Sequence, residues 1–147
     1  MNRFDDKPLV YLAMRLSDGG RANILGYIAN VGRMIREAVR LWALGYPVFV
    51  PCLDILVFIV ASALDVEVKM DDVYANSIAI MRRCDVVYIP GPALADGVGE
   101  EHNEAQRLHM PVARSRGELS QLTRGLTGKW HWPVAGIEGR KGNRCGF

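Results

Sequence analysis

The sequence predicts a single α/β domain with a Rossmann-like or flavodoxin-like fold, in which helices cover both faces of a parallel sheet of four or five strands. Short apolar runs of the kind found in buried strands alternate along the chain with longer stretches of helical periodicity. Such alternation is typical of parallel sheets, because each crossover between parallel strands carries a helix onto one face. The length of 147 residues suits one domain with one core.

The expected elements follow from the pattern of apolar residues. We expect strands at 9–13, 47–51, 86–90 and 111–115, and helices at about 25–44, 72–83, 98–108 and 118–126. The first helix has the clearest pattern, with Gly45 as its stop signal and apolar side chains at three- and four-residue steps. These are Ile28, Val31, Ile35, Ala38, Leu41 and Trp42. In the second helix, Arg82 and Arg83 are expected to complement the dipole of the last turn.

Charge divides the chain into two parts. Residues 1–113 hold 11 Lys+Arg against 14 Asp+Glu, whereas residues 114–147 hold 7 against 2. We therefore expect an α/β domain over 1–117, followed over 118–147 by a C-terminal helix and a basic, Gly-rich tail. The tail could contact phosphates, but it has no long run of charges and no recognisable motif, so nucleic acid is not expected as a partner.

Cysteine usage and hydropathy predict a cytoplasmic protein. Cys52, Cys84 and Cys145 have neither disulfide-framework nor metal-site spacing, so buried thiols in a reducing compartment are expected, and no metal. The apolar run at 55–64 is too short to span a membrane, and the opening "MNRFDDKP" is not a signal peptide. Residues 52–71 fit two interpretations equally well: an apolar helix over a pocket, or a subunit contact.

The segment "GPALADGVGEEHNEAQRLHMP", residues 91–111, places adjacent carboxylates after two glycines and a strand. Acidic residues in a first helical turn are stabilised by the helix dipole, which alone could explain Glu100 and Glu101. Their position after the carboxyl end of a strand also suggests a role in ligand binding, because open α/β sheets bind their ligands there. The backbones of Gly97 and Gly99 could approach a ligand closely, and a carboxylate beside such a cradle can act as a nucleophile.

Four segments in this order carry a resemblance to a known family: "VYLA", "LWALGYPVFVP", "NSIAIMRRCDVVYIPG" and "DGVGEEHNEAQRLHMPV". Over roughly residues 9–113 the chain resembles the nucleoside 2-deoxyribosyltransferase-like superfamily. That superfamily includes transferases that exchange bases between deoxyribonucleosides and hydrolases that remove the base from nucleoside 5′-monophosphates. The resemblance implies an enzyme that cleaves an N-glycosidic bond of a small-molecule nucleoside or nucleotide, and it calls for no cofactor.

The resemblance also implies roles for particular residues. The family's catalytic glutamate follows Gly-x-Gly-x and precedes a helix alanine by four residues, which matches Glu101 with Gly97, Gly99 and Ala105. This carboxylate would attack C1′ and form a glycosyl-enzyme intermediate. The family's tyrosine on the first strand, which orients the nucleophile, matches Tyr11, although a core aromatic is the alternative for that position.

Two departures from the family pattern concern the sugar and the leaving base. Ala95 occupies the position of a family Asp or Ser that binds the sugar hydroxyl or phosphate, and the adjacent Asp96 is expected to take over that role. Asn76 and Ser77 stand where catalytic members tend to carry an Asp that protonates the leaving base. They are retained as substrate-binding candidates, and their poor acidity leaves catalysis open.

The remaining substrate-binding candidates surround the two Gly-rich loops. Arg15 and Arg21 could hold a 5′-phosphate, and Gly97, Val98 and Gly99 offer backbone amides. This capacity for anions favours hydrolysis of a 5′-monophosphate over base transfer.

Other readings remain open. The chain could be a non-catalytic nucleotide-binding protein, acting as a sensor or sponge, which the Ser77 and Ala95 departures favour. The segment "PGPALADGVGEE" also loosely resembles the loop of cytokinin-activating-type phosphoribohydrolases. Because neighbouring subunits commonly complete active sites in the resembled family, a homodimer or higher homo-oligomer is expected, with 55–64 as a plausible contact.

Overall fold

The structure, a computed structural model, contains a doubly wound α/β sheet. It describes residues 4, 6–16, 24–53, 57, 60, 61, 63–91 and 97–124. The strands are β1 (Val10–Leu12), β2 (Val48–Phe49), β3 (Val86–Tyr88) and β4 (Val112–Ala113). All three pairings are parallel, in the order β2-β1-β3-β4. The predicted fold class is therefore confirmed, with four strands among the described residues.

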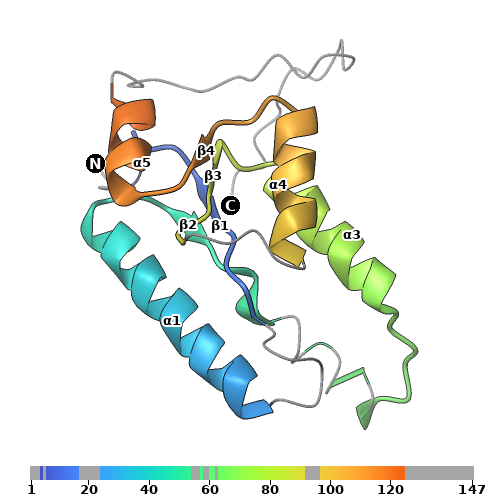
Figure 1. Cartoon of the computed structure of the whole chain (residues 1–147). Coiled ribbons are helices and arrows are strands. Elements are labelled where there is room, and N and C mark those ends of the chain that lie inside the picture. Colours follow the sequence, from blue (N-terminus) through green and yellow to red (C-terminus); the bar gives the residue numbers. More distant parts are fainter. Residues whose placement is uncertain are drawn as a thin grey trace.

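Helices lie on both faces of the sheet (Figure 1). They are α1 (Ile24–Ala43), α3 (Met70–Met81), α4 (Gly97–Arg107) and α5 (Arg116–Thr123), and a 3₁₀ turn spans Pro51–Leu53. α1 and α5 cover one face and α3 and α4 the other, so each face has its own hydrophobic core. Leu119 of α5 is fully buried in the first of these cores, so α5 packs onto the same sheet as the rest.

Successive side chains of the central strands point to opposite faces of the sheet and so belong to different cores. Val10 and Leu12 of β1 face α1 and α5, whereas Tyr11 and the following Ala13 face α3 and α4. All four are fully buried, as expected for strands inside a sheet covered on both faces. The start of β1 is fixed by Asp85, whose Oδ2 accepts a hydrogen bond of 2.7 Å from the Leu9 amide.

The boundaries of two helices show how local signals act. α1 ends at Ala43, and Gly45 adopts a φ of 85°, a left-handed conformation that glycine adopts without a Cβ penalty. α3 begins two residues before the predicted start, where the Asp72 side chain accepts from the Lys69 amide at 3.4 Å. It ends at Met81, and the two arginines expected in its last turn follow it. Arg83 still donates to the Ala79 carbonyl, at 3.1 Å.

α1 has apolar residues on two faces. Its core face carries Met34, Ala38 and Leu41, which are at most 4% exposed. Ile28, Ile35 and Trp42, which belong to the same predicted apolar pattern, are 46–60% exposed and lie outside this core. The periodicity thus identified the helix correctly but did not separate its buried face from its outer face.

Half of the run at 55–64 lies outside the described residues. Val57 and Val60 are helical and about half exposed, whereas Ala61 is buried. Both interpretations of this segment therefore stay predictions. Within the described part of the chain, no helix combines the length and the apolar character needed to cross a membrane.

Candidate active site

Tyr11 and Glu101 form a hydrogen-bonded pair between the sheet and α4. The Tyr11 hydroxyl donates to Glu101 Oε1 at 2.6 Å, between residues 90 positions apart in the chain. Tyr11 is fully buried in β1, and its ring stacks on that of Phe49, with centroids 5.7 Å apart and planes at 23°. Glu101 is only half-buried. A rigid donor therefore fixes one oxygen of a carboxylate that solvent can still reach.

The pair lies at the carboxyl edge of the sheet, close to the point where the strand order reverses. The chain leaves β1 toward β2 in one direction and then crosses to β3 and β4 on the other side. The strand order reverses between β1 and β3, and α/β sheets bind ligands outside the carboxyl ends of the strands at such a point. Gly91 follows β3 there with a φ of 120°, which a residue with a Cβ rarely adopts.

The two adjacent carboxylates differ in environment. α4 begins at Gly97, so Glu100 lies in its first turn, where the carboxylate favours the positive end of the helix dipole. Glu100 is exposed, whereas Glu101 faces the sheet and accepts from Tyr11. The dipole explanation therefore suits Glu100, and Glu101 has the environment of a held nucleophile.

The glycine segment supplies the amino end of α4. The first amides of a helix have no partner within it, so those of Gly97, Val98 and Gly99 are suited to an anion or a sugar oxygen. The Val98 side chain is 5% exposed and packs into the core against the sheet, which leaves only its backbone for a ligand. A Cβ built on Gly99 would meet no atom within 4 Å, so there is room above this turn.

The structure separates the two candidates on α3. Asn76 is exposed, whereas Ser77 is buried, with 6% of its surface accessible. They therefore point to different sides of the helix, and Ser77 is the one that faces the protein interior. Arg15 follows β1 at the carboxyl edge of the sheet and is exposed. Arg21 and Asp96 lie outside the described residues.

Arg114 is a further cation at this edge, and the sequence analysis did not identify it. It follows β4 directly, and its backbone amide donates to Glu118 Oε2 at 2.7 Å. Its Nη1 is buried and has no hydrogen-bond partner among the residues described. Because a buried guanidinium nitrogen without an acceptor is costly, this group is suited to an anionic ligand. Its signal in the sequence is an arginine at the carboxyl end of a strand.

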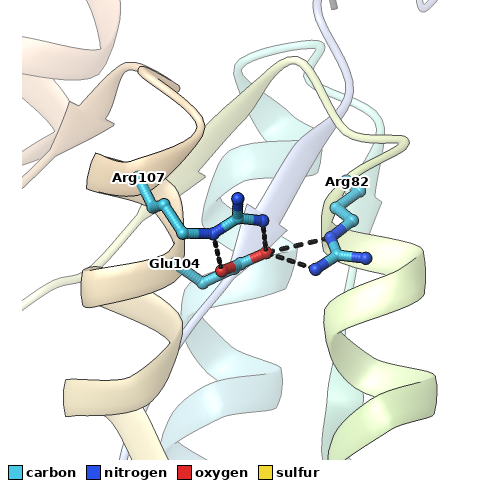
Figure 2. Close-up of polar contacts among 3 residues, drawn as sticks. All are labelled: Arg82, Glu104 and Arg107. Atoms are coloured by element: carbon cyan, nitrogen blue, oxygen red, sulfur yellow. Dashed lines mark hydrogen bonds and ion pairs between the residues drawn. The ribbon is translucent and has the colours of Figure 1, made fainter. Parts of the chain in front are cut away.

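Glu104, one turn after Glu101, fixes α4 against α3. It lies between Arg107 of its own helix and Arg82 at the end of α3 (Figure 2). Arg107 Nε and Nη2 donate to it at 2.7 and 2.8 Å, and Arg82 Nε and Nη2 at 2.9 and 2.5 Å. The hydrogen bonds from Arg107, followed by those from Arg82, lower the pKa of Glu104 to about 2. This ion-pair cluster anchors the end of α4 opposite the glycines.

We expect Glu104→Gln to lower the free energy of unfolding near pH 7 by about 1 kcal/mol, because both arginines are at least half exposed and solvent screens the pairs. A carboxyl whose pKa is depressed in the folded state stabilises the fold above its unfolded value, near 4.5, and loses that effect as pH falls toward 2. Urea unfolding from pH 7 to 2.5 should therefore show the difference between variant and parent shrinking below pH 4.5. The exposed Glu100→Gln is the control on the same helix, and a difference independent of pH would contradict the ion-pair explanation.

Searches against protein-family models, curated protein sequences and solved structures found no match. Among the described residues, no three His, Cys, Asp or Glu side chains gather in a way that could hold a metal ion. The class of protein is defined by its fold and by this geometry. It is a doubly wound α/β protein in which a glutamate is held by a tyrosine beside the point where the strand order reverses. The family resemblance stays a prediction.

Proposed function

We propose that this protein cleaves the N-glycosidic bond of a nucleoside 5′-monophosphate or nucleoside, with Glu101 as the nucleophile. The observation that carries the proposal is the 2.6 Å hydrogen bond from the buried Tyr11 hydroxyl to the half-buried Glu101 carboxylate. A nucleophile needs a fixed orientation and access to substrate, and this pair supplies both.

The reaction would proceed in two displacements. In the first, a carboxylate oxygen of Glu101 attacks C1′, the bond from C1′ to the base nitrogen breaks, and its electron pair leaves with the base. In the second, water attacks C1′, the ester oxygen leaves as the carboxylate, and the proton of the water passes to solvent. Two inversions give net retention at C1′. An acceptor base in place of water would make the enzyme a 2-deoxyribosyltransferase.

Tyr11 would act as the positioning residue. Its hydroxyl donates to Oε1, and the attack on C1′ is assigned in this proposal to Oε2. The fully buried ring, stacked on Phe49, restricts the position of that hydroxyl. The carboxylate is thereby oriented before substrate binds, which lowers the entropic cost of reaching the attacking geometry.

The departing base needs a proton, and Asn76 and Ser77 occupy the position where the resembled family carries an acid for this step. Asp96, which is expected to contact the sugar, is the acidic side chain that we propose in their place. The Ser77 hydroxyl is a poor acid, although it could bind the base. Asn76, being exposed, would contact only a part of the substrate that extends along α3.

Arg114 supports a monophosphate as the preferred substrate. It offers a buried nitrogen in need of an acceptor at the edge of the sheet where Arg15 and the amino end of α4 also lie. A phosphate could accept from Arg114 and from the free helix amides together. An uncharged nucleoside would leave this nitrogen without an acceptor, so hydrolysis of monophosphates is favoured over base transfer.

The test is a panel of common ribo- and deoxyribonucleosides and their 5′-monophosphates, incubated with the protein and analysed chromatographically for free base. We expect release from monophosphates. Arg114→Gln should lower kcat/KM for the monophosphate by about 30-fold, since a charge-assisted hydrogen bond to a buried cation is lost, and should change nucleoside turnover little. Release only with an acceptor base present would identify a transferase, and equal loss on both substrate types would contradict the phosphate role of Arg114.

A nucleotide-binding protein without catalysis is the second candidate. The observation that favours it is the buried Ser77, which cannot replace an acid. On this reading every substrate in the panel stays intact, while at least one monophosphate binds in equilibrium dialysis.

For the cellular location we propose the cytoplasm. Cys52 and Cys84 are buried free thiols. Burial, followed by the charge of Asp85, raises the pKa of Cys84 to about 12, so this thiol is held in its unreactive protonated form.

A further inference from the structure

The outer face of α1 carries a continuous apolar stripe that we call the α1 seam. Its five large residues are Leu25, Ile28, Ile35, Val39 and Trp42, which are 80, 60, 48, 53 and 46% exposed. Gly32 lies in the middle of the stripe. Their exposed fractions show that no described element covers this side of α1. Contiguous exposed apolar surface of this kind marks interaction sites, whereas scattered single residues do not.

The spacing of the seam is that of a helix pair. Its six positions follow one another at steps of three, four, three, four and three residues, the a/d repeat by which two helices pack side by side. The buried residues Met34, Ala38 and Leu41 occupy the neighbouring face, so the seam is not needed for the core. From Leu25 to Trp42 the seam extends about 26 Å at 1.5 Å per residue, comparable with the width of a small domain.

The seam is complementary to itself in the antiparallel direction. If two copies of α1 cross antiparallel about a two-fold axis between residues 33 and 34, every seam residue meets a seam residue of the other copy. Leu25 then lies opposite Trp42, and Ile28 opposite Val39. Gly32 lies opposite Ile35, so the smallest residue of the seam faces a large one. Such a self-complementary patch is what an isologous interface requires.

Gly32 itself favours this arrangement. A glycine inside a helix lowers helix stability, and a Cβ at this position would meet no atom of the described residues within 4 Å. The described part of one copy therefore gives no packing reason for a glycine here. A closely approaching second helix, with the Ile35 side chain entering the space over Gly32, gives one.

We propose that the α1 seam is the contact surface for a second copy of this chain, with the two α1 helices antiparallel across a two-fold axis. Five large apolar side chains per copy would lose most of their exposed surface. They would form the apolar centre of an interface, and stable complexes typically bury roughly 800 Å² per partner. This proposal does not depend on the proposed function, and it assigns the contact to α1 in place of the 55–64 segment.

The charges beside the seam add a measurable signature. Arg33 donates to Asn30, and Arg40 pairs with Glu37 at 2.9 Å, so both are held on their own helix. Arg36 is exposed at the flank of the seam, near the proposed axis. In the antiparallel pair the two copies of Arg36 approach each other, and salt screens their repulsion. We therefore expect association to strengthen as NaCl is raised from 50 to 500 mM. If opposite charges attracted each other across the interface, association would instead weaken over this range.

Sedimentation velocity of the full chain over a range of concentrations tests the surface. We expect a dimer, and we expect Ile35→Asp to raise its dissociation constant at least about 30-fold, the effect of removing an interface hot spot. Leu122→Asp, at a residue of α5 that is 42% exposed, is the matched control and should leave dimerisation unchanged. Circular dichroism of both variants verifies folding. A monomer at 100 µM, or a dimer that Ile35→Asp leaves intact and Val60→Asp disrupts, would overturn the proposal.

Cross-linking tests the antiparallel direction separately, in a Cys145→Ser background. Chains carrying Ile28→Cys, mixed with chains carrying Val39→Cys, should form disulfide-linked dimers of one chain of each kind, and neither variant alone should cross-link efficiently. Ile28→Cys linking to itself would indicate parallel helices and would overturn the two-fold arrangement.

Discussion

Glu101→Gln is expected to abolish base release, lowering kcat by at least about 10³-fold while leaving the fold intact. The amide has nearly the same shape as the carboxylate and can still accept from the Tyr11 hydroxyl. It is not nucleophilic enough to attack C1′, so the ester intermediate does not form. Initial rates on the best substrate of the panel, followed by chromatography, measure the effect.

Glu100→Gln is the matched control for this experiment. Both glutamates lie near the start of α4, but Glu100 is exposed and Glu101 accepts from the sheet. We expect the Glu100 variant to keep its rate within about threefold, because only a first-turn dipole interaction is lost. If Glu100→Gln abolishes base release and Glu101→Gln does not, the nucleophile has been assigned to the wrong carboxylate.

Tyr11→Phe distinguishes positioning from chemistry. The phenylalanine keeps the ring stacked on Phe49 and removes the hydroxyl that donates to Oε1. A positioning role predicts a lower kcat with an unchanged KM, because the carboxylate attacks from a wider range of orientations. A purely structural Tyr11 would instead lower stability and leave kcat unchanged.

Glu37→Leu is expected to cause a large loss of stability, about 2–3 kcal/mol in the free energy of unfolding. Glu37 of α1 is 7% exposed, and its Oε1 accepts from the Tyr88 hydroxyl at 3.0 Å. Tyr88 is itself 2% exposed, so without this acceptor its hydroxyl is buried and unsatisfied. Arg40 and Arg116, which pair with Glu37 at 2.9 and 3.4 Å, are more than half exposed and can return to water.

Tyr88→Phe is the comparison that identifies the cause. It removes the donor but leaves Glu37 with its two arginines, so the expected loss is about 1 kcal/mol. The double variant should be more stable than the sum of the two losses implies, because the phenylalanine no longer needs the missing acceptor. Urea unfolding at pH 7 measures all three variants, and strictly additive losses would mean that Glu37 acts through packing alone.

The fold could be predicted from the sequence because its main signals are local. Each strand is a short apolar run, and each helix has either a strong periodicity or a recognisable start and stop. Gly45, with its left-handed backbone, shows this directly, since a single residue type indicated where α1 ends. The sheet order β2-β1-β3-β4 was not predicted, because it depends on pairing between strands that are far apart in the chain.

Features that depend on long-range contacts could not be predicted in this way. Glu37 reads as a surface charge in an amphipathic helix, and its burial depends on Tyr88, 51 residues further along. Arg114 required knowledge of which strand ends share an edge of the sheet. The two apolar faces of α1 look like one pattern until the position of the core is known.

The candidate site was partly accessible from the sequence. Glu101 and Tyr11 were singled out by the resemblance, and no local signal indicates that residues 90 positions apart hydrogen-bond to each other. Glycines before a helix and a strand before the glycines did predict where α4 begins, because both signals are local. The contribution of Val98 was anticipated as part of this cradle, but the strand-facing side of α4 buries its side chain.

The central position of β1 has a consequence for how the Tyr11–Glu101 pair moves. β1 is bonded to β2 on one side and β3 on the other, with the Val10 amide donating to Pro47 and the Ala13 amide to Tyr88. Interior strands of this kind are among the last segments to open in native-state hydrogen exchange, whereas the ends of helices fray readily. Glu101 lies only about one turn from the start of α4, so its carboxylate is bonded to a strand that opens late, while the helix that bears it can open earlier. Rearrangement around an entering ligand would therefore occur in α4, with the tyrosine hydroxyl as the stationary point.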